Sequence, residues 1–288
     1  MTAPRKYTTA AAFRRALEDR LKHISQAEGI DLQRLRRQVA FDRLLARIFS
    51  EPKSPWVLKG GYAMELRIKQ ARATRDIDLG MKRAPDSRAS EEIDDVLRDR
   101  IQDVVERDPG DYFTFAIGKS RMGLEAAPHG GSRYPVEAGM DGRPFVKFHL
   151  DVAIGDPVIG PVQATKGRDW LGFAGIPAGS FPTLQAEQHL AEKIHAYTVP
   201  RQTPNSRVRD LLDMVLLVRT GKLSIPKVTA ALHAVFDRRK THPVPTALEP
   251  PPRDWSEPYR DLARSCGIEE DIGTAFQEVL RFWEDLKP

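Results

Sequence analysis

The sequence has 288 residues, of which 45 are basic and 40 acidic, and its net charge of +5 favours anionic partners such as nucleic acid. The single cysteine, Cys266, excludes an internal disulfide framework and a cysteine-rich zinc site. No apolar run approaches the roughly 18 residues of a membrane span, and the N-terminus has no stretch apolar enough for a secretion signal. We therefore expect a cytoplasmic protein without a membrane segment.

Residues 8–50 show the apolar spacing of two helices, the first marked by Phe13, Leu17 and Leu21. Gly29, in the sequence AEGID, predicts a turn between the two helices. The second helix carries a series of arginines that fits either a solvated helix face or a surface that contacts phosphate groups. These arginines are Arg34, Arg36, Arg37, Arg43 and Arg47.

Residues 55–160 alternate between strand patterns and helix patterns. The sequence WVLKGGYAMELRI predicts a short strand, a glycine turn and a helix, and TRDIDLGM predicts a second strand. A charged helix is expected over residues 89–107, followed by strands in YFTFAIGKS and FVKFHLDVAIGD. The sheet of the protein is therefore expected in this part of the chain.

From about residue 180 the chain has the pattern of a helical protein. Amphipathic helices are predicted in TLQAEQHLAEKIHAYT and RVRDLLDMVLLVRTG and over residues 224–240 and 269–286, whereas the Pro-rich residues 242–258 are expected to form a loop. We therefore predict an α+β fold with two domains. Residues 1–180 would form a mixed sheet with flanking and N-terminal helices, and residues 181–288 would form a mainly helical domain.

Two aspartates in the predicted strand TRDIDLGM point to a metal site. Side chains alternate between the faces of a strand, so Asp76 and Asp78 share one face while Ile77 enters the core. A divalent cation beside the two carboxylates would remove their mutual repulsion, and hard oxygen ligands suit magnesium or manganese. Arg75 is expected to point the opposite way and to form a structural ion pair.

Two further features strengthen the metal interpretation. Lys59, Gly60 and Gly61 lie between a strand and a helix, where backbone N–H groups and the helix N-terminus can bind phosphate. Asp151 adds a third carboxylate on the polar face of a later strand, which it shares with His149. Three carboxylates and a glycine turn are the parts needed for two-metal nucleotidyl transfer.

The motifs GGY, TRDIDLG and HLDVAIGD together resemble the pattern of polymerase-β type nucleotidyltransferases. With AEKIHAYT, RVRDLLDMVLL and the Pro-rich segment, the sequence looks more narrowly like the AbiEii/MenT group of toxin nucleotidyltransferases, from about residue 56 to residue 262. This resemblance implies a nucleotidyltransferase fold and a toxin of a bacterial toxin–antitoxin or phage-defence system. It also implies a cognate antitoxin as partner, and transfer of nucleotides from an NTP, with magnesium, to the 3′ acceptor end of tRNA.

The resemblance also implies roles for individual residues. Asp76 and Asp78 would hold the metal ions, and Asp151 would orient or deprotonate the acceptor hydroxyl. Lys193 would contact the triphosphate from the helical part, and Asp210 would complete the site. One departure is Tyr62, since many nucleotidyltransferases carry Ser or Thr directly after the two glycines.

Transfer of a pyrimidine nucleotide, such as that of CTP, to tRNA by a monomer is therefore the leading hypothesis. A nucleotidyltransferase that modifies a protein or small-molecule hydroxyl would use the same metal site, so the motifs do not separate the two. In a third hypothesis the protein is a non-enzymatic binding protein whose carboxylates are structural.

Overall fold

The computed structural model describes residues 6–81, 90–120, 122–123, 130–202 and 205–286. Contacts between residues divide the chain into two compact units, and neither is continuous in sequence. The sheet unit, as we call the first, comprises Met1–Leu58, Ala73–Gly155 and Ala164–Thr183. The helical unit, as we call the second, comprises Lys59–Arg72, Asp156–Gln163 and Leu184–Pro288.

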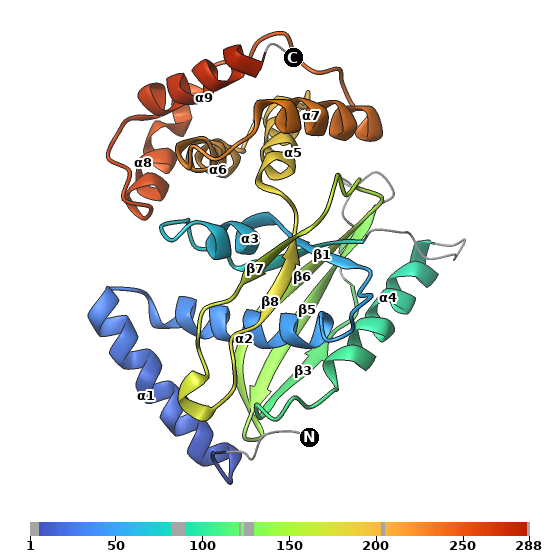
Figure 1. Ribbon diagram of the computed structural model, residues 1–288, viewed down its shortest axis with the longest axis vertical. Coiled ribbons are helices and arrows are strands. Elements are labelled where there is room, and N and C mark those ends of the chain that lie inside the picture. Colours follow the sequence, from blue (N-terminus) through green and yellow to red (C-terminus); the bar gives the residue numbers. More distant parts are fainter. Residues whose placement is uncertain (1–5, 82–89, 121, 124–129, 203–204, 287–288) are drawn as a thin grey trace. The chain divides into compact units, whose positions relative to one another are not determined.

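The sheet unit is built on a mixed sheet with the strand order β3-β5-β6-β2-β1-β8-β7, and β4 pairs with β5 (Figure 1). β2 runs parallel to β6 and β1 parallel to β8, whereas β3, β4 and β6 all run antiparallel to β5. The strands are β1 Trp56–Lys59, β2 Asp76–Met81, β3 Phe113–Ile117, β4 Met122–Gly123, β5 Gly131–Met140, β6 Arg143–Ile154, β7 Gln163–Lys166 and β8 Ser180–Thr183. The predicted mixed sheet is confirmed.

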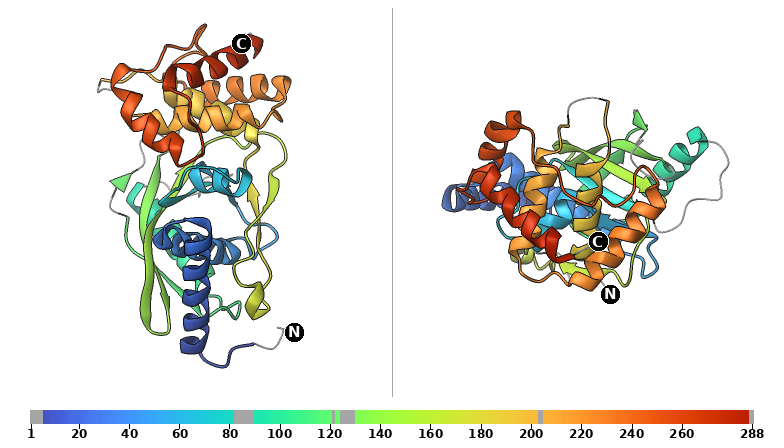
Figure 2. Two further views of the ribbon diagram at one scale, coloured as in Figure 1. Left: turned by 90° about the vertical axis from the view of Figure 1, so that its left-hand side faces the viewer. Right: turned by 90° about the horizontal axis from the view of Figure 1, so that it is seen from above.

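Three helices belong to the sheet unit, namely α1 Ala10–Glu28, α2 Leu32–Ile48 and α4 Ser90–Val105. α2 and α4 pack against each other and against the sheet, and α1 packs on α2 (Figures 1 and 2). On the covered face, the ring of Phe41 on α2 lies 4.8 Å from that of Phe148 on β6. Gly29 ends α1 with a φ of 66°, a conformation that favours glycine, which confirms the predicted turn.

Two arginines of α2 bind one buried carboxylate. Asp111, which is fully buried, accepts hydrogen bonds from Nε of Arg43 at 2.9 Å and from Nη2 of Arg47 at 2.7 Å. Arg36, two turns before Arg43, pairs with Glu18 of α1 at 2.6 Å. These three arginines therefore hold the sheet unit together. They form neither a solvated helix face nor a surface that contacts phosphate groups.

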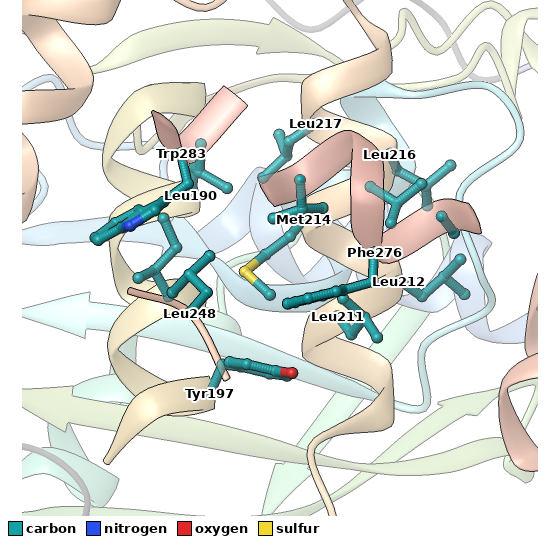
Figure 3. Packing of buried hydrophobic residues seen from close by; sticks show 14 of the residues in the cluster. Leu190, Tyr197, Leu211, Leu212, Met214, Leu216, Leu217, Leu248, Phe276 and Trp283 are labelled. Atoms are coloured by element: carbon teal, nitrogen blue, oxygen red, sulfur yellow. The ribbon is translucent and has the colours of Figure 1, made fainter. Parts of the chain in front are cut away.

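The helical unit contains α3 Gly60–Arg67, α5 Ala186–Thr198, α6 Val208–Arg219, α7 Ile225–Arg239, α8 Ser256–Arg264 and α9 Ile272–Leu286. Figure 3 shows its apolar core, in which Leu190 and Tyr197 of α5 lie among Leu212 and Met214 of α6 and Phe276 of α9. α6 is buried on almost every side, from Asp210 to Leu217. Met64 and Ala71 also belong to this core, so α3 packs with helices that follow it by more than a hundred positions.

Most predicted elements are confirmed, but one predicted loop ends earlier than expected and the strands β4, β5, β7 and β8 were not predicted. The helix expected over residues 89–107 is α4, and residue 89 lies outside the described residues. Residues 242–258 were predicted to be a loop, but a 3₁₀ turn at Arg253–Trp255 leads directly into α8. That prediction is wrong at its end, because Pro258 stands in the first turn of α8, where its missing N–H is tolerated. Of the strands that were not predicted, β5 is the longest.

None of the helices within the described ranges combines the length and the apolar composition needed to cross a membrane. The predicted domains, residues 1–180 and 181–288, stay a prediction, since the grouping of contacts does not test whether either part folds alone. The compact units add that Lys59–Arg72 and Asp156–Gln163 group with the C-terminal helices.

We expect Asp111→Ala to lower the free energy of unfolding by about 3–5 kcal/mol, because it leaves two buried guanidinium groups without their carboxylate. Urea unfolding followed by circular dichroism measures the loss. The matched control is Glu51→Ala, which removes the exposed ion pair with Arg107 and should cost less than about 1 kcal/mol. Equal losses in the two variants would contradict the role assigned to Asp111.

Candidate functional site

The predicted acidic residues of the sheet unit lie on neighbouring strands. Ile77 is fully buried, whereas Asp76 and Asp78 on either side of it are half-buried. β2 pairs with β6 so that Asp78 is opposite Asp151 and Asp76 is opposite His149. Neighbouring strands run about 5 Å apart, so this register gathers the three carboxylates on one face of the sheet.

Arg133 of β5 supplies positive charge to this group of carboxylates. Its Nε and Nη2 donate to the two oxygens of Asp151 at 2.7 and 2.6 Å, and Nη2 lies 3.9 Å from Oδ2 of Asp76. The hydrogen bonds to Asp151 and the negative charges of Asp151, Asp76 and Asp78 raise the pKa of Arg133. On the other side, Nδ1 of His149 lies 3.2 Å from Oδ1 of Asp76.

Among the residues that the structure describes, no group of three or more His, Cys, Asp and Glu side chains is arranged to hold a metal ion. Arg133 offers a physical reason, because both oxygens of Asp151 are turned toward its guanidinium group. The donors still fit the predicted metal in kind, since hard carboxylate oxygens suit magnesium and manganese. The metal-binding roles of Asp76, Asp78 and Asp151 stay a prediction.

The predicted phosphate-binding turn belongs to the helical unit, where Lys59 is followed by α3. Gly60 has a φ of 66°, so the turn uses a backbone conformation that favours glycine. Nζ of Lys59 lies 2.5 Å from Oδ2 of Asp156 and 3.8 Å from Oε2 of Glu192. Burial lowers the pKa of Lys59, but the charges of Glu192 and Asp156 outweigh burial and hold it above its ordinary value. The side chain of Tyr62 is buried.

Lys193 and Asp210, two further predicted site residues of the helical unit, lie together. Nζ of Lys193 on α5 is 2.8 Å from Oδ1 of Asp210 and 2.8 Å from Oδ2 of Asp213, both on α6. Asp213 is fully buried and also accepts two hydrogen bonds from Arg72, at 2.9 and 2.8 Å. Burial raises the pKa of Asp213, but Lys193 and Arg72 outweigh burial and hold it at about 2. Asp213 therefore stays ionised and positions both cations.

His189 is a buried histidine close to the cations of the helical unit. It lies one helical turn before Lys193, and neither of its buried ring nitrogens has a hydrogen-bond partner among the described residues. Burial and then the charges of Lys193 and Arg67 hold its pKa well below the ordinary value. His189 therefore stays uncharged beside Lys193.

A chain of hydrogen bonds connects the surface of the helical unit to Lys59. Asp156, which binds Lys59, also accepts from Nη2 of Arg239 at 2.9 Å, and Nη1 of Arg239 lies 3.3 Å from Nδ1 of His195. Nε2 of His195 lies 2.8 Å from Oγ1 of Thr241, which lies 2.9 Å from Nδ1 of His242. Because arginine only donates, His195 must accept at Nδ1, which requires it to be uncharged.

Several residues of these networks were not predicted from the sequence. Arg133 and Arg239 are single charged residues without a recognisable motif around them, and Asp156 ends the motif HLDVAIGD but was not assigned a role. Only the pairing of β5 with β6 brings Arg133 to Asp151, and only the packing of the helical unit brings Arg239 to Asp156. Asp213 was not singled out either, but it lies three residues after Asp210 on the same helix face, a spacing that could have indicated their shared partner Lys193.

Comparison with known proteins gives a match over most of the chain. A sequence model of the family described as "Nucleotidyl transferase AbiEii toxin, Type IV TA system" matches residues 43–281. No match was found among curated proteins.

Two solved structures are similar to this chain. MenT4, a nucleotidyltransferase toxin from Mycobacterium tuberculosis H37Rv, has 15% sequence identity and a TM-score of 0.55, with 93% of this chain and 97% of that chain covered. JHP933 from Helicobacter pylori has 14% identity and a TM-score of 0.48, with 89% and 95% covered. The likeness to MenT4 shows the fold, and it agrees with the nucleotidyltransferase fold that the sequence motifs implied.

We expect His195 to make the stability of the protein fall as the pH falls. Burial, and then the charges of Arg239 and His242, lower the pKa of His195 from 6.5 to about 3. The unfolded chain therefore binds a proton below pH 6.5 that the folded chain does not, so stability is full above pH 6.5 and is lost between pH 6.5 and 3. From pH 7 to pH 5 the loss is about 2 kcal/mol.

The measurement compares urea unfolding of the wild type with that of His195→Gln at pH 7 and pH 5. The wild type should lose about 2 kcal/mol more than the variant between the two pH values. The comparison isolates His195, because other groups titrate in both proteins, such as Asp42, whose pKa burial raises to about 7. A parallel pH dependence in the two proteins would contradict this assignment.

Proposed function

Since the chain belongs to the AbiEii family of nucleotidyltransferase toxins of type IV toxin–antitoxin systems, we propose that it transfers nucleotides from an NTP to the 3′ acceptor end of tRNA. The donor would be CTP or another pyrimidine nucleotide. A tRNA extended or altered at this end cannot be aminoacylated, so translation would stop. The protein would act in the cytoplasm as a monomer, neutralised by a cognate antitoxin, and would serve in phage defence.

The observation that carries the proposal is the register of β2 and β6. It brings Asp76 and Asp78 beside Asp151, and the carboxylates of a two-metal nucleotidyl-transfer site must share one surface. Asp76 and Asp78 would hold magnesium or manganese, because their hard oxygens suit these ions. The ion, when bound, would neutralise negative charge on the triphosphate.

The chain's own residues would do the remaining work in the sheet unit. Asp151 would accept the proton of the acceptor 3′-hydroxyl, whose oxygen attacks the α-phosphorus of the NTP while pyrophosphate leaves. Arg133 would position Asp151, since it binds both carboxylate oxygens. A general base must be held within hydrogen-bond reach of the proton that it removes, and a bidentate partner restricts the carboxylate to one orientation.

The residues of the helical unit would bind the triphosphate. Backbone N–H groups at Gly60 and Gly61 begin α3, and the N-terminus of a helix favours anions. Lys59 and Lys193 would add positive charge. Asp210 would hold the ammonium group of Lys193, to which it is bonded at 2.8 Å.

We expect Asp76→Asn and Asp78→Asn each to reduce nucleotide transfer to tRNA at least about a hundredfold, because a metal ion contributes several kcal/mol to charge stabilisation in the transition state. Transfer is measured with total tRNA, magnesium and each of the four labelled NTPs in turn. Mass spectrometry of the product identifies the nucleotide and the number added. The matched control is Asp103→Asn, an exposed residue of α4, which should leave the rate unchanged.

The outcomes separate the hypotheses. Absence of label in tRNA with all four NTPs would refute the tRNA substrate, and label in a protein or a small molecule would replace it by that acceptor. Transfer that survives both aspartate substitutions would refute the assigned site. If the substitutions alter stability and leave toxicity in cells intact, the protein acts by binding and not by catalysis.

A further inference from the structure

An open hollow of about 700 Å³ lies on the sheet unit beside Asp76. Its lining includes Arg37 from α2, Arg75 just before β2, and Lys147 and His149 from β6. Volumes of this size are typical of sites for small ligands. The hollow thus has room for one or two nucleotides and is too small for a duplex.

The position of the hollow follows from where β2 begins. β2 pairs with β6 only from His149 onward, so Lys147 and Phe148 extend beyond the start of β2. Arg75 immediately precedes β2 and is exposed, and both it and Arg37 line the hollow. The hollow therefore adjoins the site carboxylates at the end where β2 starts.

Two of the cations that line the hollow have no partner in the described part of the chain. Lys147 is paired with Glu137 at 2.6 Å, and Arg133 is paired with Asp151. In contrast, the side chains of Arg37 and Arg75 form no hydrogen bond or ion pair with a described residue, and Nε of Arg37 is buried without a partner. Arg75 thus does not form the expected ion pair. A buried guanidinium nitrogen without a partner is costly, which points to an anionic ligand.

The lining also holds the carboxylates of Asp76 and Glu137, and part of it is apolar. Ala116 and Gly118 of the β3 region and Pro135 of β5 contribute to it. A Cβ atom at Gly118 would lie only 2.7 Å from Cγ of Pro135, so the glycine leaves the proline ring uncovered. Apolar surfaces beside cations are typical of sites that bind unpaired nucleotides, because the base stacks while the phosphate is neutralised.

We propose that this hollow binds the unpaired nucleotides that precede the 3′ end of an acceptor RNA. Arg37 and Arg75 bind the phosphates, since guanidinium groups match phosphate oxygens in pairs, and a base lies on Ala116 and Pro135. The inference rests on the proposed function, and it adds the side from which the acceptor strand reaches Asp76. It also gives a role to one of the arginines of α2 that is not used in folding.

The test measures RNA binding without any NTP, using total tRNA and a short single-stranded RNA. We expect Arg37→Ala and Arg75→Ala each to weaken binding about tenfold and to reduce the slope of log K against log salt by about 0.7, the value for one lost phosphate contact with a single strand. The control is Arg15→Ala, an exposed residue of α1 outside the hollow, which should bind as the wild type does. Thermal unfolding checks that all variants are folded.

Kinetics of nucleotide transfer provide an independent measurement. The two variants should raise the KM for tRNA about tenfold, matching the expected loss of binding, and leave the KM for NTP unchanged. Arg37→Lys and Arg75→Lys keep the charge but lose the paired geometry, so they should recover part of the affinity.

The two proposals fail in different ways. If both alanine variants transfer nucleotides to tRNA with an unchanged KM for tRNA, the hollow does not bind the acceptor RNA, and the proposed function still stands. RNA binding that depends on Arg37 and Arg75, without transfer of any nucleotide, would support the hollow and overturn the proposed function. If the wild type binds no RNA, RNA is not the ligand of the hollow. The same conclusion follows if the arginine variants impair nucleotide transfer to a protein.

Discussion

The candidate site of the sheet unit depends on one constraint, the register of β2 and β6, which places their carboxylates side by side. Asp78 opposite Asp151, with Asp76 next to them, places like charges about 5 Å apart, and their repulsion is on the order of a few kcal/mol near a protein surface. The apolar side chains on the opposite face, such as Ile77 and Leu150, offset this repulsion by burial. A strand register shifted by one residue would bury the carboxylates and expose those apolar side chains.

Elsewhere the protein applies a common rule to three buried acidic groups, each of which is held by two cations, whereas the buried Asp42 forms an ion pair with Arg43 alone among the described residues. Asp111 binds Arg43 and Arg47, Asp213 binds Arg72 and Lys193, and Asp156 binds Lys59 and Arg239. Taking a carboxylate out of water is costly, and a single partner seldom repays it. In the helical unit this pairing also matters for ligand binding, because the carboxylates fix in place the cations that keep them ionised. A fixed cation loses little conformational entropy when it binds a ligand.

The sequence predicted the elements with strong periodicity and failed where the pattern was interrupted. Alternation in β6 and helical spacing in α2 and α5 were sufficient, whereas β5 contains Pro135 and Gly139, residues that argue against an interior strand. The face shared by Asp76 and Asp78 followed from the period of a strand, but the register that brings Asp151 beside them depends on pairing between distant segments. For the same reason no local pattern could assign a binding partner to Arg133 or Asp156, because their partners come from other elements.

The interleaving of the two compact units has a consequence for the history of the gene. The chain passes from one unit to the other after Leu58, Arg72, Gly155, Gln163 and Thr183. A simple fusion that appended coding sequence for the C-terminal helices to an ancestral transferase would not have supplied Met64 and Ala71, which complete their core from between β1 and β2. A cut at any single point of the coding sequence would likewise divide at least one unit, so neither unit can be exchanged as one uninterrupted segment.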